Sequence, residues 1–261
     1  MVVFFDIDGV IIDDDSQVIP ESTLEAIRAL GEKGHIAVVN TGRPYAHIDP
    51  RVRAMPFRGF VCGCGMELKL GDTWLSRKYP DEQMRSYLLQ SIRECGMQTI
   101  LEPASMDFIL DGEHSLHPAI LRDVERMRQR GFGIHQVSDM ETLEFVKGIT
   151  FDWPGCHREG FLKRLEPYFN CFQRDNTLIE FVPKGCSKAA GMLEFLDHLR
   201  VSREDTLAIG DSTNDLPMFS VAKHTVCMGN GMEELKAQAE YITAPILENG
   251  VEKALKHYGL I

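Results

Sequence analysis

The feature that most constrains the fold is an alternation of short apolar segments with amphipathic segments, present at both ends of the 261-residue chain. Near the N-terminus, Val2–Ile7 is a nearly continuous apolar run of strand length, typical of a strand buried on both faces. A helix is expected to open at Pro20 and to be stopped by Gly31 and Gly34. Two more strands are expected at His35–Asn40 and Phe57–Cys62.

The same alternation returns near the C-terminus. Strands that alternate with helices predict a parallel sheet with helices on both of its faces. The chain is therefore expected to contain a doubly wound α/β core. Its C-terminal strands are expected at Thr206–Ile209 and His224–Met228, and its helices at Ser187–Arg200, Thr213–Ala222, Met232–Ala239 and Asn249–His257.

The middle of the chain has a different pattern, with two expected helices and several short strand-like segments. An α+β pattern that interrupts an α/β pattern predicts an inserted domain over residues 81–183, with residues 1–80 and 184–261 forming the core. The helices are expected at Glu82–Cys95 and Pro118–Arg130, and the strands at Gln98–Leu101, Asp107–Leu110, Leu143–Lys147, Cys171–Arg174 and Thr177–Val182.

Composition and charge limit the binding partners and the cellular location that can be expected for this chain. The formal net charge of −11 argues against a nucleic acid or an anionic membrane, because both attract basic surfaces. No apolar run is long enough to cross a bilayer, and the N-terminus lacks the order of regions found in a signal peptide. Seven scattered cysteines suit reduced thiols. We therefore expect a cytoplasmic protein, either a monomer or a weak homodimer.

Two aspartates follow the first buried strand. In an open parallel sheet, ligands gather at the carboxyl ends of the strands, so Asp6 and Asp8 stand where a site is expected. Two carboxylates this close are unfavourable unless a cation joins them or one is protonated. The alternative for this pattern alone is a solvated acidic turn.

A second acidic cluster follows the strand Thr206–Ile209. Gly210-Asp211-Ser212-Thr213-Asn214-Asp215 would reach the same edge of the sheet and supply oxygen ligands for a hard cation such as Mg²⁺. The alternative is an acidic helix cap, because Asp, Ser, Thr and Asn all serve in that position.

Two further segments suit phosphate binding. Thr41-Gly42-Arg43 follows the second strand, where a hydroxyl and backbone N–H groups can hold a phosphoryl oxygen. Lys188 opens the helix after the insertion and could neutralise both a phosphate and a nucleophilic aspartate. Taken alone, the first segment would be a turn and the lysine would be exposed to solvent.

Together, D-x-D-G, T-G-R, a downstream lysine and G-D-x-x-N-D resemble the four motifs of the haloacid dehalogenase superfamily. The insertion resembles that of the Cof-type sugar-phosphate phosphatases of subclass IIB. This resemblance extends over essentially the whole chain. It implies a Rossmann-like core with a cap that closes over the site, a Mg²⁺ cofactor, a small phosphate ester as substrate and an aspartyl-phosphate intermediate.

The resemblance also implies roles for individual residues. Asp6 matches the nucleophile and a metal ligand, and Asp8 matches the general acid/base, whose backbone carbonyl also binds the metal. Asp211 matches the acidic metal ligand, supported by Asp215 and Ser212. Lys188 is preferred to Lys184 because the family lysine follows the small residue of G-x-S-K. Together with Thr41, Lys188 completes the catalytic set. The implied phosphate-binding positions are Ile7, Thr41, Gly42, Lys188 and Asn214.

Two positions depart from the family pattern. Val10 stands where D-x-D-G-T has a threonine, and Cys64-Gly65 replaces an Asn-Gly turn. Two other functions stay open at this point. One is a phosphomutase of the phosphomannomutase type, and the other is a sugar-phosphate-binding regulatory protein with a degenerate site. Retention of both Asp6 and Asp8 argues against a pure binding protein, which has no use for an acid/base carboxylate.

Overall fold

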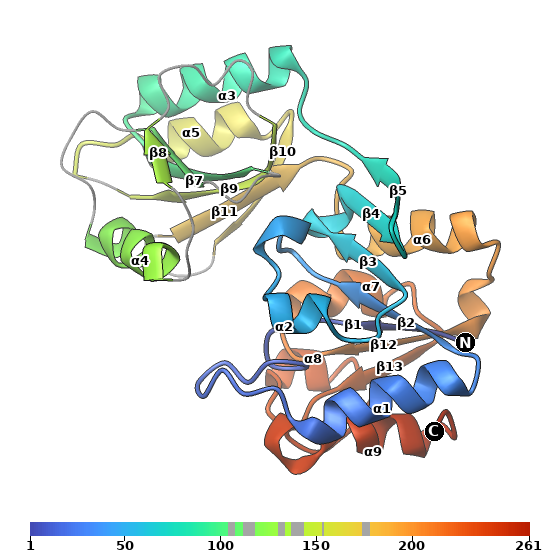
Figure 1. The fold of residues 1–261 in the computed structure, drawn as a ribbon. Coiled ribbons are helices and arrows are strands. Elements are labelled where there is room, and N and C mark those ends of the chain that lie inside the picture. The colour runs from blue at the N-terminus through green and yellow to red at the C-terminus, as the bar shows by residue number, and fades with distance from the viewer. Residues whose placement is uncertain (104–107, 112–117, 130–133, 137–143, 153, 174–177) are drawn as a thin grey trace. The chain divides into compact units, whose positions relative to one another are not determined.

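The computed structural model describes residues 1–103, 108–111, 118–129, 134–136, 144–152, 154–173 and 178–261. These residues form two compact units (Figure 1). Met1–Arg77 and Cys186–Ile261 together form the core unit, and Lys78–Gly185 forms the inserted unit. None of the helices in the described ranges combines the length and the hydropathy needed to span a bilayer.

The core unit contains an eight-stranded sheet with the order β14-β13-β12-β1-β2-β3-β4-β5. Neighbouring strands from β14 to β3 run parallel, whereas β4 and β5 are added antiparallel at one edge. The strands are β1 (Val2–Phe5), β2 (Ile36–Asn40), β3 (Gly59–Cys62), β4 (Glu67–Leu70), β5 (Thr73–Arg77), β12 (Thr206–Gly210), β13 (His224–Cys227) and β14 (Tyr241–Ile242).

Helices cover both faces of this sheet. Side chains alternate between the faces along each strand, and in β1 both sets are apolar, so each face is buried against helices. Val3 and Phe5 of β1 pack in one core with α1 and α9, and Val2 and Phe4 pack in another with α6, α7 and α8. The doubly wound parallel core predicted from the sequence is therefore confirmed. The helices are α1 (Glu21–Glu32), α2 (Pro50–Arg53), α6 (Lys188–Leu199), α7 (Leu216–Phe219), α8 (Glu233–Lys236) and α9 (Gly250–His257).

Several core elements differ from expectation. Gly31 lies inside α1, and the chain turns out of the helix at Gly34, which has a left-handed φ of 83°. The helix expected over Thr213–Ala222 is a 3₁₀ turn, Thr213–Asp215, followed by the four-residue α7. The helix expected over Met232–Ala239 is reduced to α8. The strands β4, β5 and β14 were not predicted, because they are short and at least half of each is polar or only partly buried.

The inserted unit has its own sheet, with the order β10-β11-β9-β6-β7-β8. All described neighbours in it are antiparallel except β7 and β8. The elements are α3 (Glu82–Cys95), β6 (Gln98–Pro103), β7 (Phe108–Asp111), α4 (Pro118–Gln129), β8 (Ile134–Gln136), β9 (Phe145–Phe151), α5 (Arg158–Leu165), β10 (Phe169–Gln173) and β11 (Leu178–Pro183).

Helices α3 and α5 form a separate apolar core with this second sheet, through residues such as Leu88, Phe161 and Phe181. Helix α5 was not predicted; it presents few apolar positions along its short length. The expected elements also included Asp107, Arg130, Leu143, Arg174 and Thr177, all of which lie outside the described residues.

The position of the site follows from the strand order of the core unit. β1 is flanked by β2 on one side and by β12 on the other. Strands β2 to β5 extend the sheet on one side of β1, and strands β12 to β14 extend it on the other. Ligands in open α/β sheets bind at this kind of switch point, outside the carboxyl ends of the strands. Asp6, Thr41 and Asp211 are the residues that follow β1, β2 and β12.

Candidate active site

Asp6 is the central residue of the candidate site. It follows β1 directly and is only 4% exposed. Its backbone N–H donates to the carbonyl of Ile209 in β12 at 3.0 Å, which fixes the start of the loop against the neighbouring strand. Its carboxylate accepts from Nζ of Lys188 at 2.9 Å.

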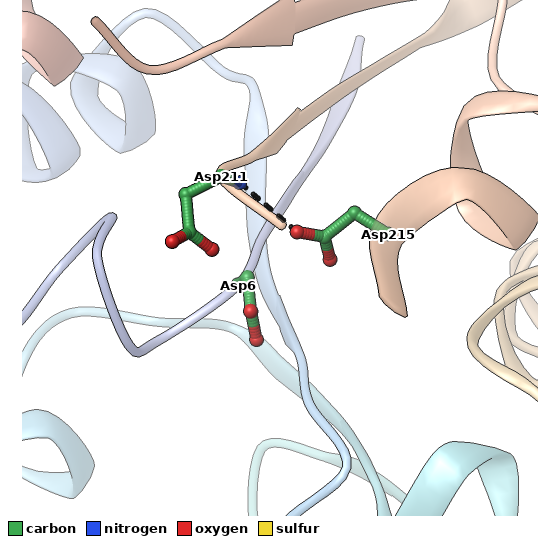
Figure 2. A group of neighbouring side chains, drawn as sticks. All are labelled: Asp6, Asp211 and Asp215. Atoms are coloured by element: carbon green, nitrogen blue, oxygen red, sulfur yellow. Dashed lines mark hydrogen bonds between the residues drawn. The ribbon is translucent and has the colours of Figure 1, made fainter. Parts of the chain in front are cut away.

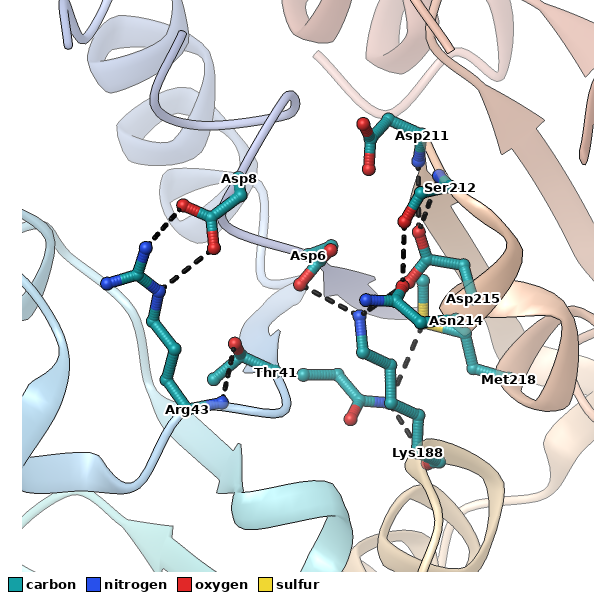
Figure 3. Close-up of polar contacts among 11 residues, drawn as sticks. Asp6, Asp8, Thr41, Arg43, Lys188, Asp211, Ser212, Asn214, Asp215 and Met218 are labelled. Atoms are coloured by element: carbon teal, nitrogen blue, oxygen red, sulfur yellow. Dashed lines mark hydrogen bonds and ion pairs between the residues drawn. The ribbon is translucent and has the colours of Figure 1, made fainter. Parts of the chain in front are cut away.

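Lys188 is the first residue of α6 and is 2% exposed. Its ammonium donates to Asp6, to Asp215 at 2.6 Å and to Asn214 at 3.2 Å (Figure 3). An ammonium has three protons, so each is directed to one of these acceptors. Burial by itself lowers the pKa of Lys188, but the carboxylates of Asp215 and Asp6 outweigh it and hold the pKa above its ordinary value. Lys188 is therefore a permanent positive charge beside Asp6.

Asn40 is a site residue that the sequence analysis missed. It ends β2, is completely buried, and donates from Nδ2 to the backbone carbonyl of Lys188 at 3.1 Å. This bond ties the first turn of α6 to the end of β2. The signal in the sequence was a polar residue closing the apolar run Ile-Ala-Val-Val directly before Thr41.

Three carboxylates gather at the ends of β1 and β12 (Figure 2). Asp6, Asp211 and Asp215 each have an oxygen within 4.8 Å of the others. Asp215 is already engaged, because one oxygen accepts from the N–H groups of Asp211 and Ser212 and the other accepts from Lys188. The carboxylate of Asp211 accepts no hydrogen bond from any residue that the structure describes.

The pKa values of two carboxylates in this cluster, Asp6 and Asp211, are raised. Burial raises the pKa of Asp6 to about 7, even though Lys188 lowers it. Burial, followed by the charges of Asp6 and Asp215, raises the pKa of Asp211 to about 8. Both shifts mean that the folded chain disfavours negative charge on these two carboxylates, first because they are buried and then because other carboxylates are near, and a bound cation would relieve this.

The donor set fits Mg²⁺. All three side chains offer oxygen, which is the ligand that Mg²⁺ prefers. The turn after β1 also leaves room for Asp211, because a Cβ added to Gly9 would lie 2.3 Å from Oδ2 of Asp211. Gly9 has a left-handed φ of 69°, which a residue with a side chain adopts only with strain. The bare backbone of Gly9 thus admits the carboxylate to the cluster.

Hydrogen-bond donors for a phosphoryl group lie beside Asp6. Thr41 accepts the N–H of Arg43 at its hydroxyl oxygen, which leaves its O–H to donate elsewhere. Asn214 uses Oδ1 to accept from Lys188 and Ser212, which leaves its NH₂ group for another acceptor. Within the described chain, the backbone N–H groups of Ile7 and Gly42 donate to no partner. The side chain of Ile7 is buried in the core, so only its backbone N–H is available to bind a phosphoryl oxygen.

Asp8 lies apart from the acidic cluster. Its carboxylate points toward Arg43 and forms two hydrogen bonds with the guanidinium, 2.9 Å to Nε and 2.8 Å to Nη2 (Figure 3). Both side chains are about one-third exposed. The carboxylate expected to act as acid/base therefore faces a different direction from the carboxylate expected to attack. The predicted role of its backbone carbonyl as a metal ligand stays a prediction.

The two departures from the family pattern occupy different environments. Val10 is completely buried in the core that contains α1 and α9. Cys64 lies in the 3₁₀ turn Gly63–Gly65 with a left-handed φ of 54°. Asn and Gly adopt that conformation more readily than Cys does. A Cβ added to Gly42 would lie 3.5 Å from the Cys64 thiol sulfur, so this turn borders the predicted phosphate site.

Residues 3–255 match the haloacid dehalogenase-like hydrolase family, and the chain belongs to this family. YkrA of Bacillus subtilis (strain 168) is 27% identical over 263 residues, which cover 99% of this chain and 98% of YkrA. The 5-amino-6-(5-phospho-D-ribitylamino)uracil phosphatase YitU of the same strain is 28% identical over 268 residues, covering 97% of this chain and 95% of YitU. The solved structure of the subclass IIB sugar phosphatase BT4131 is similar with a TM-score of 0.81 and 25% identity, covering 100% of this chain and 99% of that one.

The resemblance predicted from the four motifs, to this superfamily and to its Cof-type subclass IIB, is confirmed. The expectation that the chain is an enzyme of the hydrolase class is confirmed with it. All the predicted site residues of the core lie at the ends of β1, β2 and β12 or at the start of α6.

Proposed function

We propose that the chain is a Mg²⁺-dependent phosphatase that hydrolyses small phosphate monoesters, sugar phosphates above all, through a phosphorylated Asp6. The observation that carries this proposal is the buried carboxylate of Asp6, which is paired with the buried cation Lys188 and lies beside Asp211. A carboxylate fixed in this way can attack phosphorus and divide a difficult hydrolysis into two easier steps.

The phosphoryl group would lie next to Asp6. Its oxygens would accept from the hydroxyl of Thr41, the N–H groups of Ile7 and Gly42, and the amide of Asn214. Lys188 would contribute its charge, because its protons are already directed to Asp6, Asp215 and Asn214. Alignment and charge neutralisation of this kind supply most of the catalysis of phosphoryl transfer.

In the first step, an oxygen of Asp6 attacks phosphorus and the bond from phosphorus to the leaving oxygen breaks. That oxygen takes a proton from the carboxyl group of Asp8 and departs as an alcohol. In the second step, Asp8 accepts a proton from water as the water oxygen attacks phosphorus. The bond from phosphorus to Asp6 breaks, so that inorganic phosphate is released and the free carboxylate of Asp6 and the protonated Asp8 are restored.

The metal would be held by Asp6, Asp211 and the backbone carbonyl of Asp8. Mg²⁺ supplies positive charge that offsets the charge on the phosphoryl oxygens and on the clustered carboxylates. Asp215 would support the site by orienting Lys188 and the backbone of Asp211 and Ser212.

Three arguments support a sugar phosphate as substrate. BT4131 is a sugar phosphatase, and the substrate in the name of YitU carries its phosphate on a ribityl chain. The net charge of −11 provides no broad positive field for a polyphosphate or a nucleic acid. We further propose that the inserted unit sets the choice among substrates and that the enzyme is cytoplasmic.

The first test measures phosphate release with Mg²⁺ from hexose phosphates, pentose phosphates, nucleoside monophosphates, pyridoxal phosphate and a phosphopeptide. We expect kcat/KM to be highest for a sugar phosphate and activity to vanish in excess EDTA. A mutase would instead move phosphate between positions of one sugar and release little of it. A non-sugar preferred by about a hundredfold, or roughly 2.7 kcal/mol, would overturn the substrate class.

The second test identifies the nucleophile. Asp6→Asn should abolish any covalently bound phosphate after acid quenching, because an amide does not attack. Asp8→Asn should slow both steps while still allowing phosphate to be trapped from an ester with a good leaving group. Phosphate trapped on the Asp6→Asn protein would show that another residue attacks.

A further inference from the structure

Arg43 is a charged residue of the site to which the proposed mechanism gives no role. It belongs to the loop after β2, and the backbone of this loop is held at several points. The Arg43 N–H donates to the hydroxyl of Thr41 at 3.2 Å, and its carbonyl accepts from the N–H of Gly63 at 2.8 Å. The N–H of Tyr45 donates to the buried carboxylate of Glu67 at 2.8 Å. The guanidinium of Arg43 therefore extends from a backbone segment whose position is fixed by hydrogen bonds.

The contact between Arg43 and Asp8 has the geometry of a fork. Two nitrogens of one guanidinium meet both oxygens of one carboxylate, at 2.9 and 2.8 Å. A pair of this kind fixes the plane and the direction of the carboxylate, which a single contact does not do. Because both side chains are partly exposed, its net contribution to folding stability is small. The main effect of the pair is therefore to orient the carboxylate of Asp8 rather than to stabilise the fold.

The proposed mechanism requires the two carboxylates of this loop to face different directions. Asp6 and Asp8 are two residues apart in one loop, and Lys188 draws the carboxylate of Asp6 toward itself. The attacking carboxylate and the proton-donating carboxylate must lie on opposite sides of phosphorus for an in-line displacement. Figure 3 shows the carboxylate of Asp8 turned away from Asp6 and Lys188, toward Arg43.

We propose that Arg43 is the positioning residue for the acid/base carboxylate: its guanidinium holds Asp8 on the leaving-group side of the site, apart from the nucleophile and its lysine. This inference rests on the proposed phosphatase function and deepens it. Arg43 acts through Asp8 and does not have to touch the phosphoryl group.

A positioning role predicts a dependence on the leaving group. A basic leaving oxygen needs a proton as it departs, whereas a good leaving group departs without help, so misplacing Asp8 harms only the former. The parameter kcat/KM covers the steps up to departure of the leaving group, so the second step does not obscure the comparison. Two aryl esters of similar size, 4-methoxyphenyl phosphate and 4-nitrophenyl phosphate, provide a basic and a good leaving group.

The expected result is that Arg43→Ala lowers kcat/KM for the 4-methoxyphenyl ester about tenfold more than for the 4-nitrophenyl ester, a part of the 10²–10⁴ that general acid catalysis supplies. If Arg43→Ala does not fold, Arg43→Lys gives the same test, because one ammonium does not form both bonds of the fork. Equal losses on the two esters would mean that Arg43 binds the phosphoryl group instead, and no loss would mean that it has no role. Both results overturn the inference.

A double-mutant cycle supplies the second readout. With Asp8→Asn already present, adding Arg43→Ala should change kcat/KM for the 4-methoxyphenyl ester less than about twofold, because the residue through which Arg43 acts is gone. Losses that multiply independently would contradict the proposal.

Arg51 offers a matched control. It forms the same kind of fork with Asp49, outside the site, with nitrogen–oxygen distances of 3.1 and 2.8 Å. Arg51→Ala should leave the ratio of the two esters unchanged. A wild-type protein that cleaves neither ester would count against the proposed function itself, whereas an active wild type with an unaltered ratio in the Arg43 variants would count against this inference alone.

Discussion

The carboxylates of Asp6, Asp211 and Asp215 share a small volume with the ammonium of Lys188. The chain alone does not neutralise this volume, and the raised pKa values of Asp6 and Asp211 express that imbalance. Folding therefore brings together charges whose repulsion is relieved by protons at low pH or by a cation at higher pH. Site acidity, metal binding and stability are thus linked.

This linkage predicts how pH changes the effect of Mg²⁺ on stability. An unfolded aspartate has a pKa of about 4, so between about pH 4 and about pH 8 the folded chain holds more protons on Asp6 and Asp211 than the unfolded chain does. Without metal, the contribution of these groups to stability should fall as the pH rises through that window. Mg²⁺ needs the deprotonated carboxylates, so it should raise Tm more at about pH 8 than at about pH 6.

The measurement is thermal unfolding with Mg²⁺ and with EDTA across that range. Asp211→Asn removes one of the two groups and should flatten the pH dependence of the difference. A Mg²⁺-induced shift that is equal or larger at the acidic end would show that these carboxylates do not bind the metal.

Gly9 gives a second prediction for a single residue. In Gly9→Ala, the added Cβ would approach Oδ2 of Asp211 to 2.3 Å at a backbone angle that alanine resists, so Asp211 should be displaced. We expect kcat/KM to fall by about a hundredfold or more, the scale of losing a charge-stabilising group. Gly31→Ala is the control, because nothing lies within 4 Å of its added Cβ. It should keep full activity and stabilise α1 by up to about 1 kcal/mol.

Among the elements, α6 does the most to place the site, because its first residue is Lys188. Ser187 caps this helix by accepting the N–H of Ala190 at 3.0 Å, and Asn40 holds the Lys188 carbonyl from β2. Close contact with the turn Gly63–Gly65 adds a third restraint, since a Cβ on Gly65 would lie 2.7 Å from the backbone of Gly191. The position of the lysine is thus set by backbone contacts around its helix start.

Ser187→Ala should therefore affect both stability and activity. Loss of the cap is expected to lower the free energy of unfolding by about 1 kcal/mol. It should also lower kcat, because the first turn of α6 frays and Lys188 with it. Ser202→Ala is the matched control, since Ser202 accepts the N–H of Glu204 at 3.2 Å in a turn outside the site. A similar loss of stability with unchanged kcat in both variants would show that the cap does not position Lys188.

The sequence predicts the site more fully than its surroundings, for a physical reason. Parallel strands bring their carboxyl ends to one edge, so Asp6, Thr41 and Asp211 could be placed together from strand order alone. The fork between Asp8 and Arg43 and the bond from Asn40 to Lys188 depend on side-chain directions that no spacing encodes. The hairpin β4–β5 was missed because its strands are short and β5 carries polar residues on both faces.

At the scale of the whole chain, the two units have separate apolar cores. Among the residues that the structure describes, no buried one belongs both to the cores around the first sheet and to the core of α3 and α5 in the second. The boundary of the units at Lys78 and Gly185 lies within three residues of the predicted one, residues 81–183. Each unit can therefore be expected to fold without the apolar surface of the other.

Replacement of residues 78–185 by a short flexible linker tests this independence. The remaining core should unfold cooperatively and keep slow activity on 4-nitrophenyl phosphate, while discrimination among natural phosphate esters collapses. Circular dichroism and steady-state kinetics measure the two effects. Unchanged discrimination would locate specificity in the loops of the core instead.

The pairing of β1 with β12 has a consequence for synthesis of the chain. Val2 lies opposite Thr206, so one edge of the central strand stays unpaired until synthesis has reached β12. At about 5–20 residues per second, the ribosome needs roughly 6 to 26 seconds to pass from the end of β5 to the start of β12. The inserted unit is continuous in sequence and can fold during that interval, whereas Val-Val-Phe-Phe of β1 keeps an exposed, unpaired apolar edge.

A chain released after residue 185 should therefore aggregate through its first strands while the inserted unit resists proteolysis. Nascent chains of this protein would be most in need of a chaperone at that length.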